Sequence, residues 1–492
     1  MKPDKQAESQ TDQRHFWRRV HADRARVIVD GADYFKILRK AMLKAEKRII
    51  LIGWDFDTRI SLSKDKSEEG DPPLALGDFV QWLADNRPDL EIKILKWKTS
   101  AIKLLGRGST MVTVAKWAMH DRIEFKLDGA HPVGCSHHQK IVVIDDNFGV
   151  CGGIDMTTDR WDTREHIGQD ARRKRPNGTQ YSPWHDVTMI VDGEAASALG
   201  DLARDRWITA GGEQLEPLQL ENNPWPDDVE PQFENLDITI ARTRAEYGDV
   251  EQVREIEALF LDQIRRAEKF IYIENQYFTS RKIADAIALR LEEPDPPEII
   301  LVMPKTADGW LEQKAMDSAR AKIVAAIRAK KDTSKFAIFT PVNEANEDIY
   351  VHAKIMIIDD KILRVGSANL NNRSLGLDSE CDLVIDSRET NDRAIAEQIA
   401  AIRFSLIAEH CGIDEQLAAD ALTAGRSMIE FINQPRDCKR KLLPFEIPDL
   451  DTTEELLADN KLLDPERPDE FFEPLSDRSL VGEIVTRFTP SD

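Results

Sequence analysis

The chain has 492 residues, of which 41% are hydrophobic and 32% are charged, and 67 Lys and Arg against 89 Asp and Glu give a formal net charge of −22. This length suggests two to three domains of roughly 150 residues each, and the composition excludes a disordered chain. The longest apolar runs, such as residues 49–52 and 141–144, are far shorter than the ~20 residues that cross a bilayer, which excludes a membrane-spanning protein.

The termini, cysteines and charge indicate where the protein acts. Residues 1–10 contain no apolar stretch that could form the core of a secretory signal, so we expect no Sec export. Five cysteines at irregular spacings favour reduced thiols in a reducing compartment. We therefore expect a cytoplasmic or peripheral membrane protein, with export as an effector without a cleaved signal as the alternative. The strong acidity argues against general nucleic-acid binding without excluding a local basic cleft.

A repeat divides the sequence into two similar parts. Residues 45–52 (AEKRIILI) recur at residues 267–274 (AEKFIYIE), and each copy is predicted to be a helix end that runs into a buried strand. Apolar residues at helical spacing mark the preceding helices, namely Phe35, Leu38, Met42 and Ala45 in the first part and Val253, Ile256, Phe260 and Ile264 in the second. Both parts therefore begin with a helix and a buried strand.

The later elements also follow one order in both parts. The first part has predicted strands at residues 92–95, 141–144 and 187–191 and predicted helices near residues 75–86, 110–120 and 194–208. The second part has predicted strands at residues 299–302, 355–358 and 383–385 and predicted helices near residues 280–291, 309–329 and 389–410. Alternating helices and strands indicate the α/β class, so we predict two α/β sandwich halves.

Composition places the domain boundaries. Residues 214–237 contain four prolines, Asn222-Asn223 and several acids, which is typical of a linker. We therefore predict a polar N-terminal segment at residues 1–25, a first half at 26–213, a linker at 214–237, a second half at 238–412 and a C-terminal extension at 413–492. Residues 442–492 hold 14 acidic and 4 basic residues, which predicts a tail that wraps the surface or is partly disordered. An interaction segment is the alternative.

The sharpest signal is a duplicated motif. An H-x-K-x4-D pattern at His138, Lys140 and Asp145 returns at His352, Lys354 and Asp359. Seventeen residues beyond each His, the repeats place Asp155 and Asn369. A single match of three residues has little weight, whereas a duplicated and extended match is specific.

The period of a strand determines which of these side chains share a face. His138 and Lys140 are two residues apart and point from one face, whereas Ile141 and Val143 point to the opposite, buried face. If the two halves meet about a pseudo-twofold axis, two His, two Lys and an Asn gather in one pocket. Such a set of imidazoles and cations suits a phosphodiester substrate.

On these residues the sequence resembles the phospholipase D superfamily, whose hallmark is the duplicated H-x-K-x4-D motif. The resemblance covers roughly residues 30–410. Further stretches are similar to phosphatidylcholine-hydrolysing members, namely residues 152–155, 160–162, 183–187, 273–278, 366–369 and 378–380. The resemblance implies an α/β fold of two pseudo-twofold-related α/β/α sandwich halves with the active site in the cleft between them, plus the acidic C-terminal tail. It implies no metal and no cofactor.

The resemblance also implies roles for the motif residues. His138 would attack phosphorus and form a phosphohistidine, and His352 would protonate the departing alcohol and later deprotonate water or an acceptor alcohol. Lys140, Lys354 and Asn369 would hold the non-bridging phosphate oxygens.

Acidic residues would orient the two His rings. Glu380 is expected to orient His352, and the acid for His138 is Asp186 or Asp162, with Asp186 preferred. Asp155 stands where the second half has Asn, and its carboxylate would repel a phosphate unless it is paired with a Lys or protonated.

The two motif aspartates differ from the other motif residues. Asp145 and Asp359 are counted with the catalytic motif. However, each lies an odd number of residues from its His and ends a buried strand, so an architectural role is favoured over a chemical one.

Several features have alternative interpretations. A zinc site at His131, Cys135, His137 and His138 is disfavoured because the second half has no such cluster. Cys135 near His138 resembles a Cys-His nucleophile pair without the rest of an acyl-transfer site. The basic run at residues 172–175 could dock on anionic lipid or simply be solvated. Trp54, Trp97, Trp161 and Trp184 could form an interfacial rim or belong to the core.

The favoured function is a phospholipase D that acts on phosphatidylcholine-like lipids at a membrane surface, with transfer to alcohols and without a calcium requirement. A cardiolipin synthase-type phosphatidyltransferase is the nearest alternative, followed by a nuclease of the same family and a non-catalytic lipid- or phosphate-binding protein. Nucleic acid is not an expected partner. Since both motif copies lie in one chain, a monomer could hold the whole site.

Overall fold

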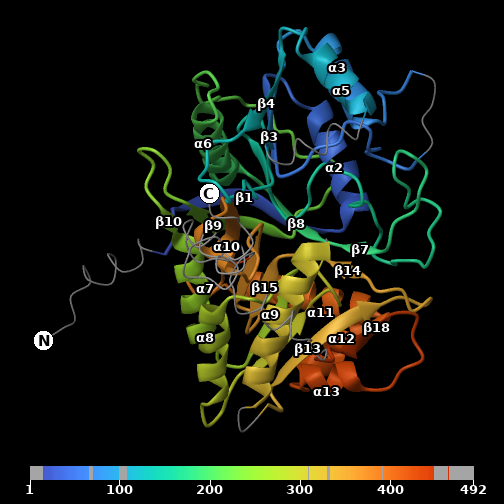
Figure 1. Cartoon of the computed structure of the whole chain (residues 1–492), viewed down its shortest axis with the longest axis vertical. Coiled ribbons are helices and arrows are strands. Elements are labelled where there is room, and N and C mark those ends of the chain that lie inside the picture. The colour runs from blue at the N-terminus through green and yellow to red at the C-terminus, as the bar shows by residue number, and fades with distance from the viewer. Residues whose placement is uncertain are drawn as a thin grey trace, which may run out of the picture.

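The computed structural model describes residues 15–65, 70–98, 108–307, 310–329, 333–390, 392–447 and 464. Within them, the chain forms two α/β halves that lie one above the other, the N-terminal half in blue and green and the C-terminal half in yellow and orange (Figure 1). The predicted acidic tail at residues 442–492 lies outside the described residues, apart from 442–447 and Asp464. No helix in the described residues is long and apolar enough to cross a membrane.

The first half contains eight strands and four helices with defined bounds. The strands are β1 (Arg18–Val29), β2 (Arg48–Gly53), β3 (Glu91–Trp97), β4 (Ile123–Asp128), β5 (Ile141–Ile144), β6 (Phe148–Gly152), β7 (Trp184–His185) and β8 (Val187–Asp192). The helices are α2 (Gly31–Leu43), α3 (Leu76–Asn86), α5 (Gly108–Trp117) and α6 (Gly193–Thr209). All the strands and helices predicted for this half are present.

The second half repeats this order and adds a C-terminal extension. Its strands are β9 (Phe233–Arg244), β10 (Val253–Arg254), β11 (Phe270–Glu274), β12 (Glu298–Val302), β13 (Phe336–Val342), β14 (Tyr350–Val351), β15 (Ile355–Ile358), β16 (Ile362–Gly366), β17 (Glu380–Asp386) and β18 (Lys441–Pro444). Its helices are α7 (Glu255–Arg266), α8 (Arg281–Leu291), α9 (Trp310–Arg328), α10 (Asn372–Gly376), α11 (Arg393–Cys411), α12 (Glu415–Thr423) and α13 (Met428–Asn433).

The strand order reveals the pseudo-twofold relation between the halves. One continuous sheet runs β18-β13-β12-β11-β15-β16-β17-β9-β1-β8-β6-β5-β2-β3-β4, so the order outward from the β1–β9 pair is alike on both sides. β1 and β9 are antiparallel neighbours, with Arg18 opposite Ile240 and Ala25 opposite Phe233. The fold expected from the resemblance is confirmed, with both halves joined in a single sheet.

The two central strands were not predicted from the sequence. β1 starts at Arg18, inside the polar segment predicted for residues 1–25, and β9 starts at Phe233, inside the predicted linker. Their charged side chains hide the strand pattern, because these charges have partners across the sheet. Arg24, for example, forms an ion pair with the buried Asp192 at 2.7 Å.

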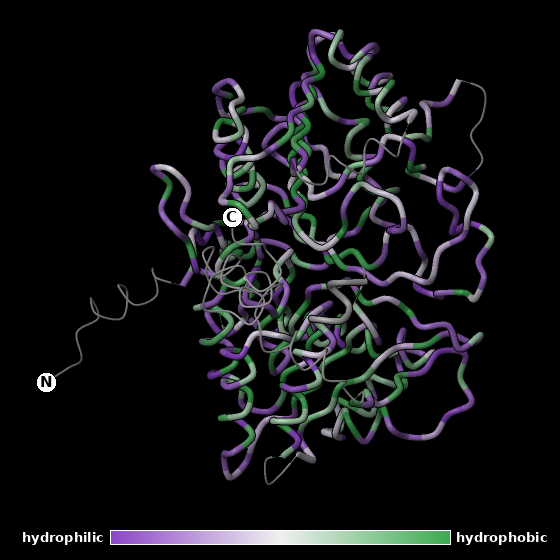
Figure 2. The backbone as a smooth tube through the Cα atoms, viewed as in Figure 1, coloured by the Kyte–Doolittle hydropathy of each residue, from purple (hydrophilic) through white to green (hydrophobic). Residues whose placement is uncertain are grey.

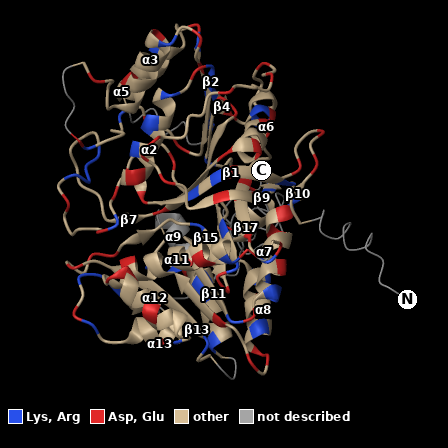
Figure 3. Cartoon of the chain, turned by 180° about the vertical axis from the view of Figure 1, so that it is seen from behind, with Lys and Arg blue, Asp and Glu red and all other residues tan. Residues whose placement is uncertain are grey.

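Three apolar cores hold helices on the sheet. One core combines side chains of α6, α11, α12 and α13, a second contains those of α2 and α3, and a third contains those of α7, α8 and α9. Hydrophobic stretches accordingly run along the strands inside each half (Figure 2), while charges of both signs alternate on the outer faces of α7 and α8 (Figure 3). The apolar residues of β5 alternate between two of these cores, since Ile141 and Val143 belong to one and Val142 and Ile144 to the other.

Local signals set the helix ends. Ser280 and Asp392 cap α8 and α11, and their side chains accept hydrogen bonds from the backbone N–H groups of Ile283 and Ala394. α11 stops at Gly412, whose φ of 62° is a left-handed conformation that favours glycine. The C-terminal end of α11, predicted near residue 410, agrees with this stop at Gly412.

Candidate active site

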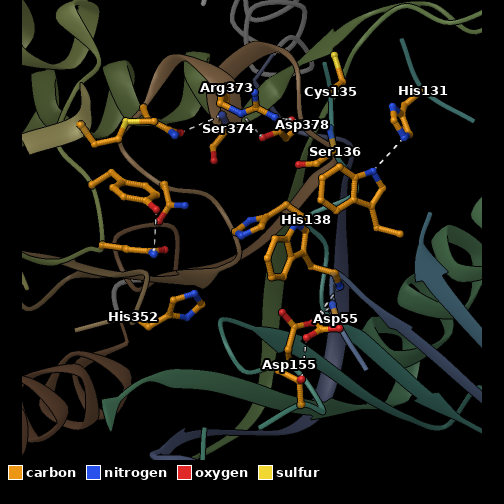
Figure 4. A pocket seen from close by; sticks show the side chains of 18 of the residues that line it. Asp55, His131, Cys135, Ser136, His138, Asp155, His352, Arg373, Ser374 and Asp378 are labelled. Atoms are coloured by element: carbon orange, nitrogen blue, oxygen red, sulfur yellow. Dashed lines mark hydrogen bonds and ion pairs between the residues drawn. The ribbon is translucent and has the colours of Figure 1, made fainter. Parts of the chain in front are cut away.

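A cavity of about 760 Å³ lies between the two halves. Its walls include loops that follow β2, β3, β4 and β6 in the first half and β11, β14 and β16 in the second. His138 and His352 both line it, and Figure 4 shows their rings entering from opposite sides. The predicted meeting of the two motif copies in one cleft is therefore observed.

Backbone bridges between the halves place the two His residues. The His138 N–H donates to the Ser379 carbonyl of the second half at 3.0 Å, and the His352 N–H donates to the His185 carbonyl of the first half at 2.8 Å. β14 pairs in parallel with β7 directly before His352. Each His thus comes from one half and is anchored on the other.

The orienting acids are also exchanged between the halves, which corrects the predicted pairing. Glu380 lies 3.0 Å from Nδ1 of His138, and Asp186 lies 2.7 Å from Nδ1 of His352. The prediction that Glu380 orients His352 and Asp186 or Asp162 orients His138 was wrong. The pseudo-twofold axis brings each acid to the His of the opposite half.

Asp162 belongs to a different network. Its carboxylate contacts His166 at 3.0 Å and Arg173 at 3.1 Å, and it accepts the Trp184 N–H at 2.9 Å. It therefore orients neither His138 nor His352.

The surroundings keep both rings neutral in the ligand-free site. Burial, followed by the charges of Lys140 and Lys354, lowers the pKa of His138 well below its usual value. Burial and Lys354 do the same for the pKa of His352. Nδ1 of His138 faces the Ser367 carbonyl, which can only accept, at 3.1 Å as well as Glu380, and Nδ1 of His352 faces Asp186, so each ring holds its proton at Nδ1 and Nε2 remains available to the cavity. Burial also raises the pKa of Glu380 to about 8.

The two lysines lie behind the His rings. Lys140 donates to the His138 carbonyl at 2.8 Å, and Lys354 donates to the His352 carbonyl and, at 3.3 Å, to Gln276. Both are buried and neither is among the residues that line the cavity. Their charges therefore act on the cavity from beneath its floor. Burial lowers the pKa of Lys354 to about 7.

This lowered pKa predicts a pH dependence. Lys354 is charged below about pH 7 and loses its charge above it, so attraction of an anionic diester weakens as the pH rises. We expect kcat/KM, which reports on the free enzyme, to fall as the pH rises above about 7. In Lys354→Arg the guanidinium stays charged, so this decline should move to higher pH. If the decline of kcat/KM at high pH is unchanged in Lys354→Arg, a group other than Lys354 causes it.

Asp155 and Asn369 both line the cavity, as predicted. The Asp155 carboxylate lies 3.3 Å from Lys140 and accepts the Trp54 N–H at 2.9 Å, so its charge is paired. This pairing removes the expected repulsion of a phosphate. Oδ1 of Asn369 has no hydrogen-bond partner among the described residues, and its amide is therefore available to a ligand.

The motif aspartates Asp145 and Asp359 lie away from the cavity. Asp145 accepts hydrogen bonds from the backbone N–H groups of residues 46–48 at 2.7 to 2.8 Å, and Asp359 accepts those of residues 268–270 at 2.7 to 2.8 Å. Each carboxylate thus fixes the start of the neighbouring strand, β2 or β11. Their grouping with the catalytic residues is corrected, and the favoured architectural role agrees with these contacts.

Replacement of Asp145 should therefore affect stability rather than chemistry. Asp145→Ala leaves three backbone donors without their acceptor, and we expect a loss of about 3 kcal/mol in the free energy of unfolding. Denaturant unfolding measures this loss, and kcat per folded molecule should stay near the wild-type value. A kcat that falls while stability is unchanged would contradict the architectural role.

Ser367, Tyr350 and Arg160 also belong to the site and were not singled out from the sequence, which had named Trp184 only as a possible rim or core residue. The Ser367 hydroxyl donates a hydrogen bond to Glu380. The Trp184 ring stacks on Tyr350 at 4.6 Å and lies 5.1 Å from the His352 ring. Arg160 lines the cavity and lies over the Trp184 ring. No periodicity marks such residues, although Arg160 and Trp184 fall in stretches that carry the family resemblance.

The alternative interpretations of the cavity region are resolved by contacts. His131 accepts from Trp97 and His137 contacts Asp128, so they do not form a zinc site with Cys135. Burial raises the pKa of the Cys135 thiol to about 12, which disfavours a nucleophilic thiolate.

The structure also shows the contacts of the basic run and the positions of the tryptophans. In the basic run, Arg172, Arg173 and Arg175 form ion pairs with Asp170, Asp162 and Asp159. Trp54, Trp97 and Trp184 line the cavity, whereas Trp161 belongs to the core.

Comparisons with known proteins agree with this site. The family model described as "Phospholipase D" matches residues 41–285, and the one described as "Cardiolipin synthase, PLD-like domain" matches residues 260–401. The chain therefore belongs to the phospholipase D superfamily. Its two matched domains are those of a phosphodiesterase or phosphatidyltransferase enzyme.

Several named relatives share this similarity. The chain is 26% identical to Phospholipase D1 of Saccharomyces cerevisiae, over 79% of this chain and 29% of that protein. It is 24% identical to Phospholipase D A of Dictyostelium discoideum, over 80% and 36% of the two chains, and 24% identical to Phospholipase D alpha 4 of Arabidopsis thaliana, over 78% and 64%. The chain thus spans less than two thirds of each of these relatives.

A solved structure has a similar fold. Phosphatidylserine synthase of Haemophilus influenzae aligns with a TM-score of 0.56 and 13% identity, over 82% of this chain and 90% of that chain. At this identity the likeness concerns the fold alone.

Proposed function

We propose that this protein is a phospholipase D. It hydrolyses the distal phosphodiester bond of phosphatidylcholine-like glycerophospholipids to phosphatidic acid and a free alcohol, and transfers the phosphatidyl group to alcohols. One observation carries the proposal: two neutral imidazoles face one cavity, and each is held by a buried acid of the opposite half. Such a pair suits one nucleophile and one general acid–base.

In the first half-reaction, Nε2 of His138 attacks phosphorus and forms a P–N bond. The P–O bond to the headgroup breaks, and the headgroup oxygen takes a proton from Nε2 of His352. The low pKa of His352 in the free site favours loss of this proton to the leaving group. The negative charge of the bound diester offsets the two lysines, so the ring becomes protonated only when substrate is present.

In the second half-reaction, water or an alcohol replaces the headgroup. Nε2 of His352 accepts the proton of the incoming hydroxyl, whose oxygen attacks phosphorus as the P–N bond breaks. His138 is regenerated as a neutral ring, and the product is phosphatidic acid with water or a new phosphatidyl ester with an alcohol. Lys140 and Lys354 stabilise the charge on the phosphoryl oxygens in both steps.

The cavity walls support a cationic headgroup. Trp54 and Trp97 stack at 5.8 Å on one side of the space. Aromatic faces attract quaternary and primary ammonium groups. Phosphatidylcholine and phosphatidylethanolamine are therefore the proposed substrates, encountered by the protein at a membrane surface.

A phosphatidyltransferase of the cardiolipin synthase type is the second candidate. The family description matched by residues 260–401 favours it. The chemistry is the same, and only the acceptor alcohol differs, since phosphatidylglycerol replaces water.

Product analysis distinguishes these functions. Mixed vesicles of phosphatidylcholine, phosphatidylethanolamine and phosphatidylglycerol are incubated with the protein, with and without ethanol, and the lipids are analysed by mass spectrometry. We expect phosphatidic acid without ethanol and phosphatidylethanol with it. Cardiolipin from phosphatidylglycerol would favour the transferase, and no lipid turnover would contradict both functions.

A further inference from the structure

A second cluster of His and carboxylate side chains lies behind the active site, where the two halves meet. Asp30, His166 and His185 come from the first half, and Glu409 comes from α11 of the second. All four are buried, with at most 5% of their surface exposed, and none lines the cavity. One ring nitrogen or carboxylate oxygen from each lies within 4.8 Å of the others.

Several close contacts within this cluster are not hydrogen bonds. Nδ1 of His185 lies 2.9 Å from Glu409 and 3.2 Å from Asp30, yet this nitrogen has no hydrogen-bond partner among the described residues. Oδ2 of Asp30 also has no such partner, although it lies 3.5 Å from Nε2 of His166. Only His166 and Glu409 form a hydrogen bond, at 3.2 Å. A buried nitrogen and oxygen without a partner are costly.

These distances fit the edges of a coordination tetrahedron. Metal–nitrogen and metal–oxygen bonds of roughly 2.0 to 2.1 Å to zinc place neighbouring ligand atoms about 3.3 Å apart. With Oδ2 of Asp30 as the ligand atom, three separations lie around this value: His185 Nδ1 to Glu409 Oε1 at 2.9 Å, His166 Nε2 to Glu409 Oε1 at 3.2 Å and His166 Nε2 to Asp30 Oδ2 at 3.5 Å. In such an arrangement the lone pairs point at a common centre, which explains why most of the contacts lack hydrogen-bond geometry.

The outer contacts are those that metal-binding His residues require. Nδ1 of His166 contacts Asp162 at 3.0 Å, and Nε2 of His185 contacts Glu274 at 2.7 Å. A carboxylate at the second ring nitrogen fixes the tautomer and aims the first nitrogen at the metal. Glu409 is held in a similar way, because its other oxygen pairs with Arg164.

A neighbouring group provides a contrast. His185, Glu274 and His410 are also close enough to share an ion. Here Glu274 has hydrogen bonds to both His rings, at 2.7 and 3.0 Å, and to Tyr272 at 2.6 Å. Since the ring nitrogens that face Glu274 already have partners, this group needs no cation.

Charge points to the same centre. The carboxylates of Asp30, Asp162, Glu274 and Glu409 bring four negative charges, and Arg164 and Arg173 pair with two of these residues. Two negative charges remain in this buried region, and in a metal-free chain only protonation of the His166 and His185 rings would balance them. One divalent cation would neutralise them.

We propose that Asp30, His166, His185 and Glu409 bind one divalent metal ion of the zinc class. The site is structural, because it joins both halves and lies outside the cavity. It also supports the chemistry indirectly, since Asp30 accepts the backbone N–H of Asp186 at 3.1 Å and Asp186 orients His352. The proposal departs from the metal-free chain implied by the family resemblance, and it does not depend on the substrate.

Metal analysis of the full chain, purified without a polyhistidine tag, tests the site. After the protein is loaded with zinc and dialysed, we expect elemental mass spectrometry to find about one zinc ion per chain. His166→Asn and Asp30→Asn should lose this zinc. His21→Asn is the matched control, because the half-exposed His21 ring contacts Asp23 and Asp237 instead of the cluster and its loss should leave the zinc content unchanged.

Measurements on the wild-type chain keep the test valid if the variants fail to fold. A strong chelator should lower Tm, and added zinc should restore it, because a metal that binds only the folded chain stabilises it. Co²⁺ should give the visible absorption of a tetrahedral site and lose it when zinc is added. Absence of zinc from the loaded wild type, or equal zinc in wild type and His166→Asn, would overturn the proposal and assign the missing charges to protonated His rings.

Discussion

His138→Asn should abolish release of the headgroup and formation of the covalent phosphoenzyme together. Asn has no ring nitrogen that can bond to phosphorus, so the first half-reaction loses its nucleophile. We expect turnover to fall on the order of 10⁴-fold or more, as measured by headgroup release from phosphatidylcholine vesicles. Rapid acid quench followed by peptide mass spectrometry should find phosphorylated His138 in the wild type alone.

The matched control carries the same substitution at the surface. His21→Asn should retain wild-type turnover, which separates loss of the nucleophile from loss of a His in general. His352→Asn should still form the phosphoenzyme from a substrate with a nitrophenol leaving group, because that group needs no proton. A phosphoryl group on residue 352 in the wild type would invert the two roles.

The exchange of acids between the halves predicts that Asp186 and Glu380 act on different steps. Asp186→Asn should impair the acid–base function of His352, and Glu380→Gln should impair the nucleophile His138. With a choline leaving group, we expect each variant to lose on the order of 10²- to 10⁴-fold in kcat, since the amide no longer stabilises a charged ring.

A change of leaving group separates the two variants. With a phosphatidyl nitrophenol, Asp186→Asn should recover phosphoenzyme formation, because no proton has to be supplied. Glu380→Gln should not recover. The measurement is the burst of nitrophenol in a stopped-flow instrument. If Glu380→Gln recovers the nitrophenol burst and Asp186→Asn does not, Glu380 would instead serve His352 and Asp186 would serve His138.

Much of the fold was predictable because local hydrophobic patterns mark most of its strands and helices. The apolar strands at residues 49–52, 141–144 and 355–358 and the amphipathic helices between them have clear periods, so their positions agreed with the structure to within a few residues. β1 and β9 were missed because their charged residues hide the alternation. These charges are tolerated in central strands only because partners such as Asp192 come from elsewhere in the chain.

The sequence by itself determined the duplicated motif, the class of fold and the identity of His138 and His352 as a pair, because spacing within each repeat is a local property. Only the tertiary structure decided which acid serves which His, that Asp145 and Asp359 fix strand starts, and that Asp30, His166, His185 and Glu409 share one centre. The physical reason is the pseudo-twofold packing. It joins residues from opposite halves, and neither periodicity nor spacing along the chain records which of them meet.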